Sequence, residues 1–279
     1  WQRGGGSLCI LHDYKTNPTE ENLTPDWPDG TFLRPDLSYD ARRVLFAWAR
    51  YYPDLQHKAD KTAKEEIPED AFFHIFEMDL QTRECRQLTH GRYDDFDARY
   101  LPDGDIVFLS TRKGTFLQTG KKSVQSTLET AMPDSFVRCG GGKSRPVAVY
   151  TLHAMDARGE NMRQISAFEN FEWTPSIAHD GRIIYARWDY IDRFNGPFIS
   201  LWSTRPDGTA TQLLYGNYTK APQCVFEARA IPGSTKLIFT AAAHHSNIGG
   251  SLAIFDRMLG TEFERPIQRI TPEVPFPET

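Results

Sequence analysis

Two interleaved series of repeated strands predict an all-β fold for this chain, specifically a β-propeller of four-stranded blades. In the first series, a tight turn precedes a short apolar strand, and Asp180-Gly181 before Ile183-Ile184-Tyr185 is the clearest example. Its copies occupy residues 37–46, 101–108, 178–185 and 231–239. A second strand follows each of these units, at residues 74–79, 152–156, 201–208 and 252–256, with an earlier copy at 7–13.

A hydrophobic residue followed by Thr or Ser closes most of the repeats, at residues 23–24, 88–89, 165–166 and 270–271. Each repeat thus supplies about four short strands, two joined by the tight turn and two by a polar hairpin, as in a propeller blade. One blade cannot bury both of its faces, so neighbouring blades must stack against it. An ordinary β-sandwich is the alternative, but two series in a fixed order favour the propeller.

The 279 residues fit one all-β domain, so we expect 1–279 to form a single β-propeller domain or a fragment of one. About five blades are visible when the half-blades at both ends are counted, which is few for a closed ring. The sequence starts at Trp1, without a signal-peptide pattern, as expected for a mature or excised piece. The rest of a ring of roughly six or seven blades lies outside this sequence, or the two ends complete one shared blade.

Two insertions interrupt the repeat, near residues 51–71 and 113–146. The first is charged and suits a short surface helix. The second contains the glycine run Gly140-Gly141-Gly142, which is not a phosphate-binding loop because it lacks the G-x-x-x-x-G-K-[ST] spacing. Insertions of this length in compact domains are usually functional or disordered.

Composition excludes several classes of function. The net charge of −5 argues against a nucleic-acid partner, which would require clustered Lys and Arg. No apolar run approaches the roughly eighteen residues of a membrane span. The four cysteines, Cys9, Cys85, Cys139 and Cys224, have no C-x-x-C spacing, so no zinc knuckle or covalent haem site is encoded. Cys9 and Cys224 have apolar neighbours in the sequence, and we expect both to be buried.

Seven short stretches carry a family resemblance, at residues 134–141, 171–176, 185–190, 200–204, 226–229, 231–234 and 270–275. In these stretches the chain resembles the propeller domain of the hydrazine synthase alpha-subunit type, from about Ser38 onward. Its Asp-Gly turns are shared with the wider TolB-like and WD-like propellers. One departure is Gly142, where the resemblance leads us to expect a second cysteine after Cys139, and this weakens any disulfide or metal role for Cys139.

The resemblance implies a propeller carried in a larger periplasmic or secreted protein, often beside cytochrome-type domains. It does not imply hydrazine synthesis, because the haem-attachment motif needed for that chemistry is absent from these residues.

Polar residues at equivalent places in successive repeats are expected to gather at the central funnel of the propeller. The candidates for ligand binding are Glu172, Arg187, Asp189, Glu227 and Arg229. Buried charges are costly unless they are paired or used, so two interpretations stay open. In one, Arg with Trp binds an acidic sugar or carboxylate. In the other, Glu172–Arg187 and Glu227–Arg229 are structural ion pairs between blades.

Adjacent His244 and His245 add a candidate metal site, because neutral imidazole together with carboxylate suits zinc, manganese or iron. Neighbouring side chains in a strand face opposite ways, so we expect only one of the two to ligate. No nucleophile elbow of the G-x-S-x-G type is present.

The favoured hypothesis is a binding or scaffold module of a larger extracytoplasmic protein, which contacts a partner domain or a small ligand at its funnel. Its partners would be other domains of the same polypeptide, a partner protein, or an acidic small molecule or sugar, but neither nucleic acid nor a membrane span. The competing hypothesis is a metal-dependent enzyme, such as a lyase acting on acidic sugars. Its metal ligand would be His244 or His245, Arg187 or Arg229 would neutralise the substrate carboxylate, and Glu227 would be the base.

Overall fold

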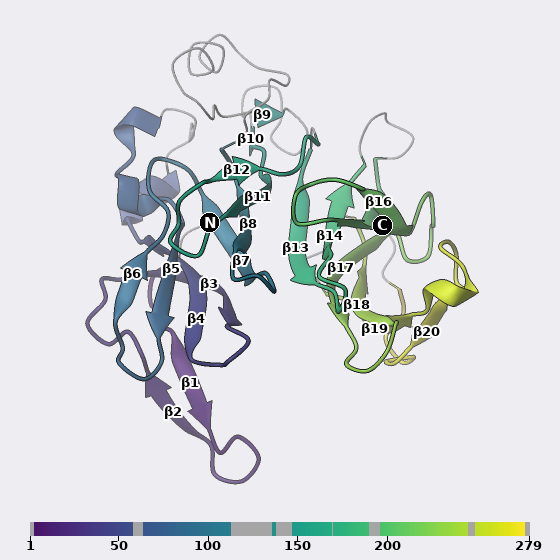
Figure 1. Ribbon diagram of the computed structural model, residues 1–279, viewed down its shortest axis with the longest axis horizontal. Helices are drawn as coiled ribbons and strands as arrows, with labels where there is room; N and C mark the ends of the chain where they lie inside the picture. Colours follow the sequence, from purple (N-terminus) through teal and green to yellow (C-terminus); the bar gives the residue numbers. More distant parts are fainter. Residues whose placement is uncertain are drawn as a thin grey trace. The chain divides into compact units, whose positions relative to one another are not determined.

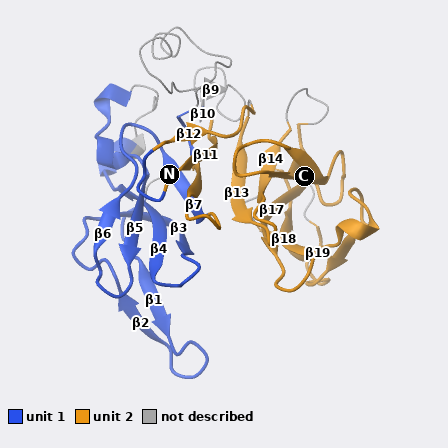
Figure 2. Ribbon diagram, viewed as in Figure 1, with its two compact units in different colours: residues 1–100, 110–148, 157–160 blue, residues 101–109, 149–156, 161–279 orange. Residues whose placement is uncertain are grey.

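The computed structural model describes residues 3–57, 64–112, 136–137, 147–168, 170–189, 196–244 and 249–276. Within these ranges the chain consists almost entirely of short β-strands joined by turns, which confirms the all-β prediction (Figure 1). The chain divides into two compact units, and each is described by itself (Figure 2). Unit 1 comprises residues 1–100, 110–148 and 157–160, and unit 2 comprises residues 101–109, 149–156 and 161–279.

Two sheets of four strands follow each other in the first part of the chain, with the orders β3-β4-β5-β6 and β12-β11-β8-β7. Their strands are β3 Gly30–Leu37, β4 Arg43–Arg50, β5 His74–Asp79, β6 Cys85–Gln87, β7 Asp95–Tyr100, β8 Ile106–Ser110, β11 Thr151–Met155 and β12 Arg163–Gln164. In the first sheet, each strand pairs antiparallel with the next one in sequence, which is the strand order of a propeller blade.

The second half of the chain forms one eight-stranded sheet that consists of two antiparallel groups of four. The groups are joined by a single parallel pair, Ile199 opposite Cys224. The strands are β13 Glu172–Ile177, β14 Ile183–Trp188, β15 Ile199–Thr204, β16 Gln212–Tyr215, β17 Cys224–Ala230, β18 Leu237–Ala242, β19 Ser251–Phe255 and β20 Ile267–Arg269. We call β13–β16 the third sheet and β17–β20 the fourth sheet, although the parallel pair joins them. Each has the four strands predicted for a blade.

Two short hairpins and four 3-10 turns complete the described elements. The first hairpin, β1 Cys9–His12 with β2 Thr19–Asn22, lies where the earlier copy of the second series was expected. The other pairs β9 Phe136–Val137 with β10 Val147–Ala148 at the second insertion, most of which lies outside the described residues. The 3-10 turns are η1 Pro53–His57, η2 Lys64–Glu66, η3 Glu69–Ala71 and η4 Arg257–Leu259.

The first insertion has three 3-10 turns in its described residues, 51–57 and 64–71, and the rest of the segment expected to be a short helix lies outside them. Ile67, Ala71 and Phe72 bury their side chains there against Tyr52 and Leu55, so the two ends of the insertion pack on each other. None of the helical segments in the described ranges has the length and apolarity needed to cross a membrane.

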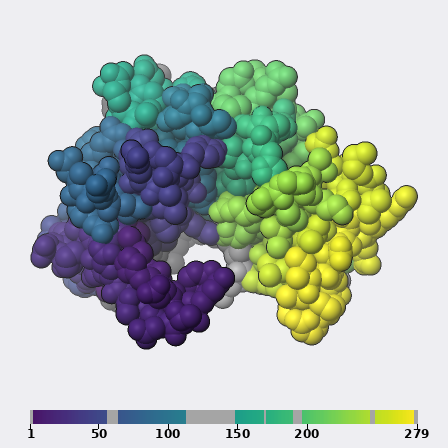
Figure 3. Space-filling model, turned by 60° about the horizontal axis from the view of Figure 1, so that its bottom comes forward, coloured from purple at the N-terminus to yellow at the C-terminus, as the bar shows by residue number. Residues whose placement is uncertain are grey.

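Each unit contains a buried apolar cluster. In unit 1, Phe46, Trp48 and Phe76 are buried together, with the partly buried Trp27 packed on them. In unit 2, buried residues of the third and fourth sheets form one cluster that includes Tyr215 and Phe239. The segment with η4 and β20, yellow in Figure 3, lies at the surface of unit 2. Cys224 is buried as predicted, whereas Cys9 is only half-buried.

The repeated Thr has the same structural role in three copies of the repeat. Its hydroxyl accepts a hydrogen bond from the backbone N–H at the start of the second strand before it in the sequence, and so satisfies a donor that the sheet leaves unpaired. The three bonds are Leu8 N–H to Thr24 Oγ1 (3.1 Å), Ile75 N–H to Thr89 Oγ1 (3.0 Å) and Leu252 N–H to Thr271 Oγ1 (2.9 Å). The closing step seen in the sequence is thus a hydrogen-bonded clamp between the last two strands of a repeat.

The first strand of every four-stranded sheet carries a residue in the left-handed region at the same place in the repeat. These residues are Arg34 (φ 51°), Asp97 (φ 56°), Thr174 (φ 50°) and Glu227 (φ 55°). In β3, β13 and β17 the strand register shifts at this position, which marks a β-bulge. A non-glycine residue in this conformation costs about 1–2 kcal/mol, so its recurrence identifies a feature of the repeat.

The first strands pack against one another within each unit, β3 beside β7 in unit 1 and β13 beside β17 in unit 2. This packing brings the polar residues that flank each bulge close to those of the neighbouring sheet. The predicted funnel candidates of unit 2 lie on or next to these strands.

Candidate functional site

All five predicted ligand-binding residues lie in unit 2. Glu172 is the first residue of β13, Arg187 lies in β14, and Asp189 directly follows β14. Glu227 and Arg229 lie on β17, at the bulge and two residues after it. The interpretation of Glu172–Arg187 as an ion pair expected the two residues on adjacent blades. In the structure they lie directly opposite each other on β13 and β14, within one four-stranded group.

Arg187 is the centre of a small cluster of charged and aromatic side chains. Its guanidinium carbon lies 3.5 Å from the ring centroid of Phe168 and 3.9 Å from that of Trp202. Its Nε forms an ion pair with Asp189 Oδ1 at 3.0 Å, and the Trp202 Nε1–H donates to Asp189 Oδ2 at 3.0 Å. We call Arg187, Asp189, Phe168 and Trp202 together the Arg187 cluster.

The planar cation is stacked against two aromatic rings, an arrangement that favours arginine over lysine. Because the rings cover the faces of the guanidinium, its edge is the part left for further hydrogen bonds. The side chains of Arg187 and Asp189 are only 16% and 17% exposed, so any ligand at that edge would interact in a partly desolvated setting.

The environment of Asp189 contains opposing electrostatic effects. Burial raises the pKa of this carboxyl, and the nearby Arg187 together with the hydrogen bond from Trp202 partly offsets that shift. The charged form of Asp189 therefore depends on its neighbours in the cluster. Removal of the arginine would leave a buried carboxylate without its cation.

Glu172 has the same structural role as the closing Thr of other repeats, because it accepts a hydrogen bond from a backbone N–H. Its carboxylate is fully buried, and Oε2 accepts the backbone N–H of Leu152 at 2.8 Å. Ser166 stands at the Thr position of this repeat, and its hydroxyl donates to Glu172 Oε1 at 2.6 Å. The carboxylate and Ser166 together replace the threonine clamp, which gives Glu172 a structural task at this place.

Glu227 and Arg229 connect the third and fourth sheets through the backbone. The N–H of Glu227 donates to Thr174 Oγ1 at 3.1 Å, which links the two bulge residues. The Nη1 of Arg229 donates to the carbonyl of Pro175 at 3.3 Å, and Ser176 Oγ donates to the carbonyl of Ala228 at 2.6 Å. These bonds position β13 against β17 within unit 2.

The structure describes only one of the two predicted metal ligands. The ring of His244 packs on Trp188, with ring centroids 5.2 Å apart, whereas His245 lies outside the described residues. Across the described ranges, no three His, Cys, Asp or Glu side chains lie close enough together to hold a metal ion. The metal site at His244 and His245 thus stays a prediction.

Sequence reasoning did not select Phe168 or Trp202 as site residues. Trp202 belongs to the second strand series and was read only as part of a strand, while Phe168 precedes β13 in a connecting segment. The signal available for Trp202 was its place in β15 beside the strand of Arg187, because cross-strand neighbours on one face interact. Phe168 carried no comparable sequence signal.

The four-stranded antiparallel meanders, the equivalent bulges and the polar residues beside them define a protein of the β-propeller class. Solved propeller structures resemble it. Hydrazine synthase of Kuenenia stuttgartiensis has a TM-score of 0.62 and 14% identity, over 91% of this chain and 34% of that chain. An oligogalacturonate lyase in complex with manganese has a TM-score of 0.52 and 13% identity, over 90% of this chain and 56% of that chain.

TolB from Acinetobacter baumannii also matches, with a TM-score of 0.46 and 14% identity, over 90% of this chain and 49% of that chain. The first two structures, with TM-scores above 0.5, share the fold of this chain. The chain spans about a third of the hydrazine synthase chain and about half of the lyase chain. No model of a known protein family matches the sequence, and no curated protein matches it significantly.

Proposed function

We propose that this chain is a β-propeller binding module of a larger extracytoplasmic protein, and that the Arg187 cluster binds a carboxylate of a partner domain or small acidic ligand. The observation that carries the proposal is the guanidinium held between Phe168 and Trp202 and oriented by Asp189. An arginine fixed in this way presents its donors to a carboxylate without first losing side-chain freedom.

The wider context of the proposal comes from the resemblance to the hydrazine synthase alpha-subunit type. This chain matches 34% of the length of a hydrazine synthase chain, which supports a module within a larger protein. A periplasmic or secreted location and association with cytochrome-type domains are part of the same proposal.

The competing proposal is a metal-dependent lyase acting on acidic sugars. The similarity to an oligogalacturonate lyase in complex with manganese supports it, at the level of the fold. In this proposal His244 or His245 ligates the metal, Arg187 or Arg229 neutralises the substrate carboxylate, and Glu227 is the base. The two proposals share the acidic ligand and differ in whether metal is needed and bonds are broken.

Titration calorimetry with trigalacturonate, with and without manganese, tests the shared part. The informative variant is Arg187→Lys, which keeps the charge beside Asp189 but loses the planar fork of donors and its stacking. We expect binding to weaken at least about tenfold, the effect of losing one charge-assisted hydrogen bond. Arg158→Lys is the matched control, because Arg158 is 70% exposed and pairs with Glu160 at the surface of unit 1.

Metal content decides between the two proposals. Stoichiometric manganese, zinc or iron that is lost in a His244→Ala/His245→Ala variant, together with new unsaturated ends in the sugar, would establish the lyase. Metal-independent binding that is weakened by Arg187→Lys supports the binding module. If trigalacturonate and citrate both fail to bind the unmodified chain, the small-ligand form of the proposal is wrong.

A further inference from the structure

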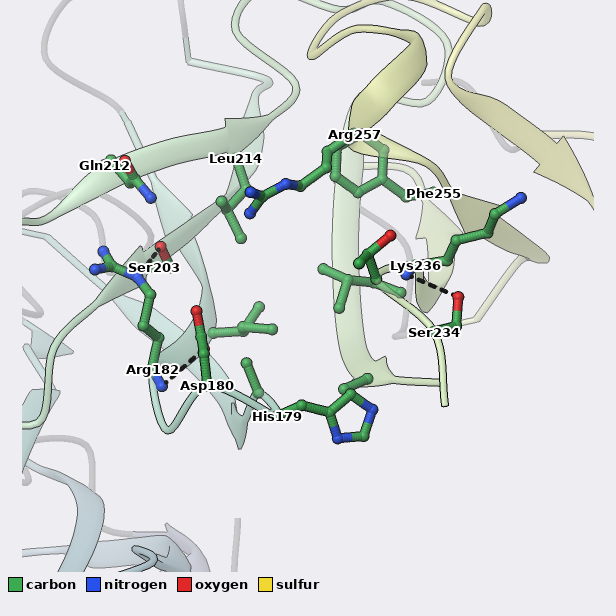
Figure 4. Close-up of a pocket in the computed structure, with 15 residues that line it drawn as sticks. His179, Asp180, Arg182, Ser203, Gln212, Leu214, Ser234, Lys236, Phe255 and Arg257 are labelled. Carbon is green, nitrogen blue, oxygen red and sulfur yellow. Dashed lines mark hydrogen bonds between the residues drawn. The ribbon is translucent and has the colours of Figure 1, made fainter. Parts of the chain in front are cut away.

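A cavity of about 220 Å³ lies within unit 2, between the turn that follows β13 and the turn that follows β17 (Figure 4). Its apolar surface comes from the third and fourth sheets, with Ile184, Leu214, Leu237 and Phe255 among the lining residues. None of the four residues of the Arg187 cluster lines it. The cavity is therefore a site separate from the one described above.

The polar lining of the cavity is predominantly basic. Arg182, Lys236 and Arg257 contribute three positive charges against the single negative charge of Asp180. Lys236 is already paired with Asp256 at 3.1 Å, and Asp180 offsets one of the two arginines, so one positive charge is unbalanced. This local excess contrasts with the net charge of −5 for the whole chain.

The two arginines differ in how they are held. Arg182 is fixed by bonds from its Nε to Ser203 Oγ (3.1 Å) and from its Nη2 to the carbonyl of Ala210 (2.5 Å). The guanidinium of Arg257 forms no hydrogen bond or ion pair with another residue in the described part of the chain. In Figure 4 it extends over the cavity toward Leu214.

One end of the cavity is bounded by a bond between the two sheets. The Nε2–H of His179 donates to the carbonyl of Ile231 at 2.9 Å, and this bond ties the turn after β13 to the turn after β17. The cavity walls are thus connected by a direct bond as well as by the shared apolar cluster. A ligand would enter a largely formed site, which limits the cost of ordering it.

We propose that this cavity binds a small organic anion that carries a carboxylate or phosphate on a compact apolar body. The apolar floor removes the body from water, and Arg257, with Arg182 also in the lining, binds the anionic group. The volume is below the roughly 300–1,000 Å³ of sites for drug-sized molecules, so the ligand is smaller than these. The inference is independent of the proposed function, because it uses none of the residues of the Arg187 cluster.

Phenylacetate is a suitable probe, since it combines a carboxylate with one aromatic ring. Its binding to the full chain can be followed by nuclear magnetic resonance of the arginine Nε–H groups and by calorimetry. Phenethylamine has a similar body with the opposite charge, and inorganic phosphate is an anion without an apolar body. We expect phenylacetate to bind more tightly than either.

Arg257→Gln should weaken phenylacetate binding about tenfold, and the charge reversal Arg257→Glu should weaken it further. Arg257 is exposed on a 3-10 turn, so both variants are expected to fold, and Arg158→Gln is the matched surface control. Arg187→Lys should remove any binding at the Arg187 cluster, whereas the phenylacetate-dependent shift of the Arg257 Nε–H signal should remain, which separates the cavity from the Arg187 cluster.

Three results would overturn the proposal. The first is phenylacetate binding that is equal in the unmodified chain and in Arg257→Glu. The second is loss of binding in Arg187→Lys together with retention in Arg257→Gln, because the anion would then occupy the other site. The third is phenethylamine or phosphate binding at least as tightly as phenylacetate. Tight binding of phenethylamine would show that the negative charge has no role, and tight binding of phosphate would show that the apolar floor has none.

Discussion

The substitution Glu172→Ala separates a structural role of this carboxylate from a ligand-binding one. Glu172 is fully buried and accepts bonds from the Leu152 N–H and the Ser166 hydroxyl. Its removal leaves the Leu152 N–H without its acceptor in a buried place, and an unsatisfied group of this kind costs about 1–3 kcal/mol. With the bond to Ser166 also lost, we expect the free energy of unfolding to fall by about 2–4 kcal/mol.

Glu172→Gln provides the matched comparison. The amide oxygen can still accept from Leu152, and the amide nitrogen can donate to the hydroxyl of Ser166, so we expect a loss of about 1 kcal/mol. Glu160→Ala is the surface control, because that carboxylate is 63% exposed and its ion pair with Arg158 is expected to contribute less than about 1 kcal/mol.

Urea unfolding followed by tryptophan fluorescence measures all three variants, and an unchanged slope with urea shows that the same surface unfolds in each. The reasoning would be refuted if Glu172→Ala lost less than about 0.5 kcal/mol, or if Glu172→Gln were as destabilised as the alanine variant. If Glu172→Gln had normal stability but no longer bound an acidic ligand, Glu172 would instead be a ligand-binding residue.

Three further predictions concern separate features. Glu227→Gly should be about 1 kcal/mol more stable than Glu227→Ala by urea unfolding, since only glycine tolerates φ 55° without strain; equal stability would contradict the bulge geometry. Burial lowers the pKa of His74 below 6.5, so the unfolded chain binds a proton at this residue more readily than the folded chain does. The free energy of unfolding of the unmodified chain should therefore fall between pH 7 and 5.5, and that of His74→Gln should fall less. Burial raises the pKa of Cys224 to about 12, so iodoacetamide at pH 8 should label this thiol only after unfolding; rapid labelling of folded protein would exclude its burial.

The repeat could be predicted from the sequence because its signals are local. An Asp-Gly turn determines where a hairpin reverses, and the apolar run after Gly181 determines which strand is buried. The closing Thr could also be recognised as a repeated position. Its hydrogen bond became visible only once Ile75 and Thr89, which are distant in sequence, were seen to lie together.

The bulges could have been found but were not. In each first strand an aromatic residue or Leu precedes the left-handed residue, and Pro or Ala follows it, as in Trp173-Thr174-Pro175 and Phe226-Glu227-Ala228. A positive φ in residues such as Thr is rare, so strand propensity alone predicts an uninterrupted strand. The repeated pattern was the only available sign.

Two of the five predicted ligand-binding residues, Arg187 and Asp189, lie in the Arg187 cluster, and their role in binding stays a prediction. Arg187 and Asp189 were selected because they follow a buried strand, and they do form an ion pair. Phe168 comes from a connecting segment, and its ring reaches Arg187 only through the arrangement of the chain in space. The basic cavity was not anticipated either, because Arg182 and Arg257 are far apart in sequence, one in the turn after β13 and the other in η4.

The bulges also affect how this chain behaves towards other copies of itself. The strands β3, β7 and β13 are the outer members of their sheets in strand order, and such edges are templates on which another chain can add a strand and start aggregation. A left-handed residue twists the edge away from the straight path that an incoming strand needs, and Pro35 and Pro175 remove a backbone N–H next to it. The same kink that brings polar side chains together therefore also disfavours intermolecular β-pairing along these strands.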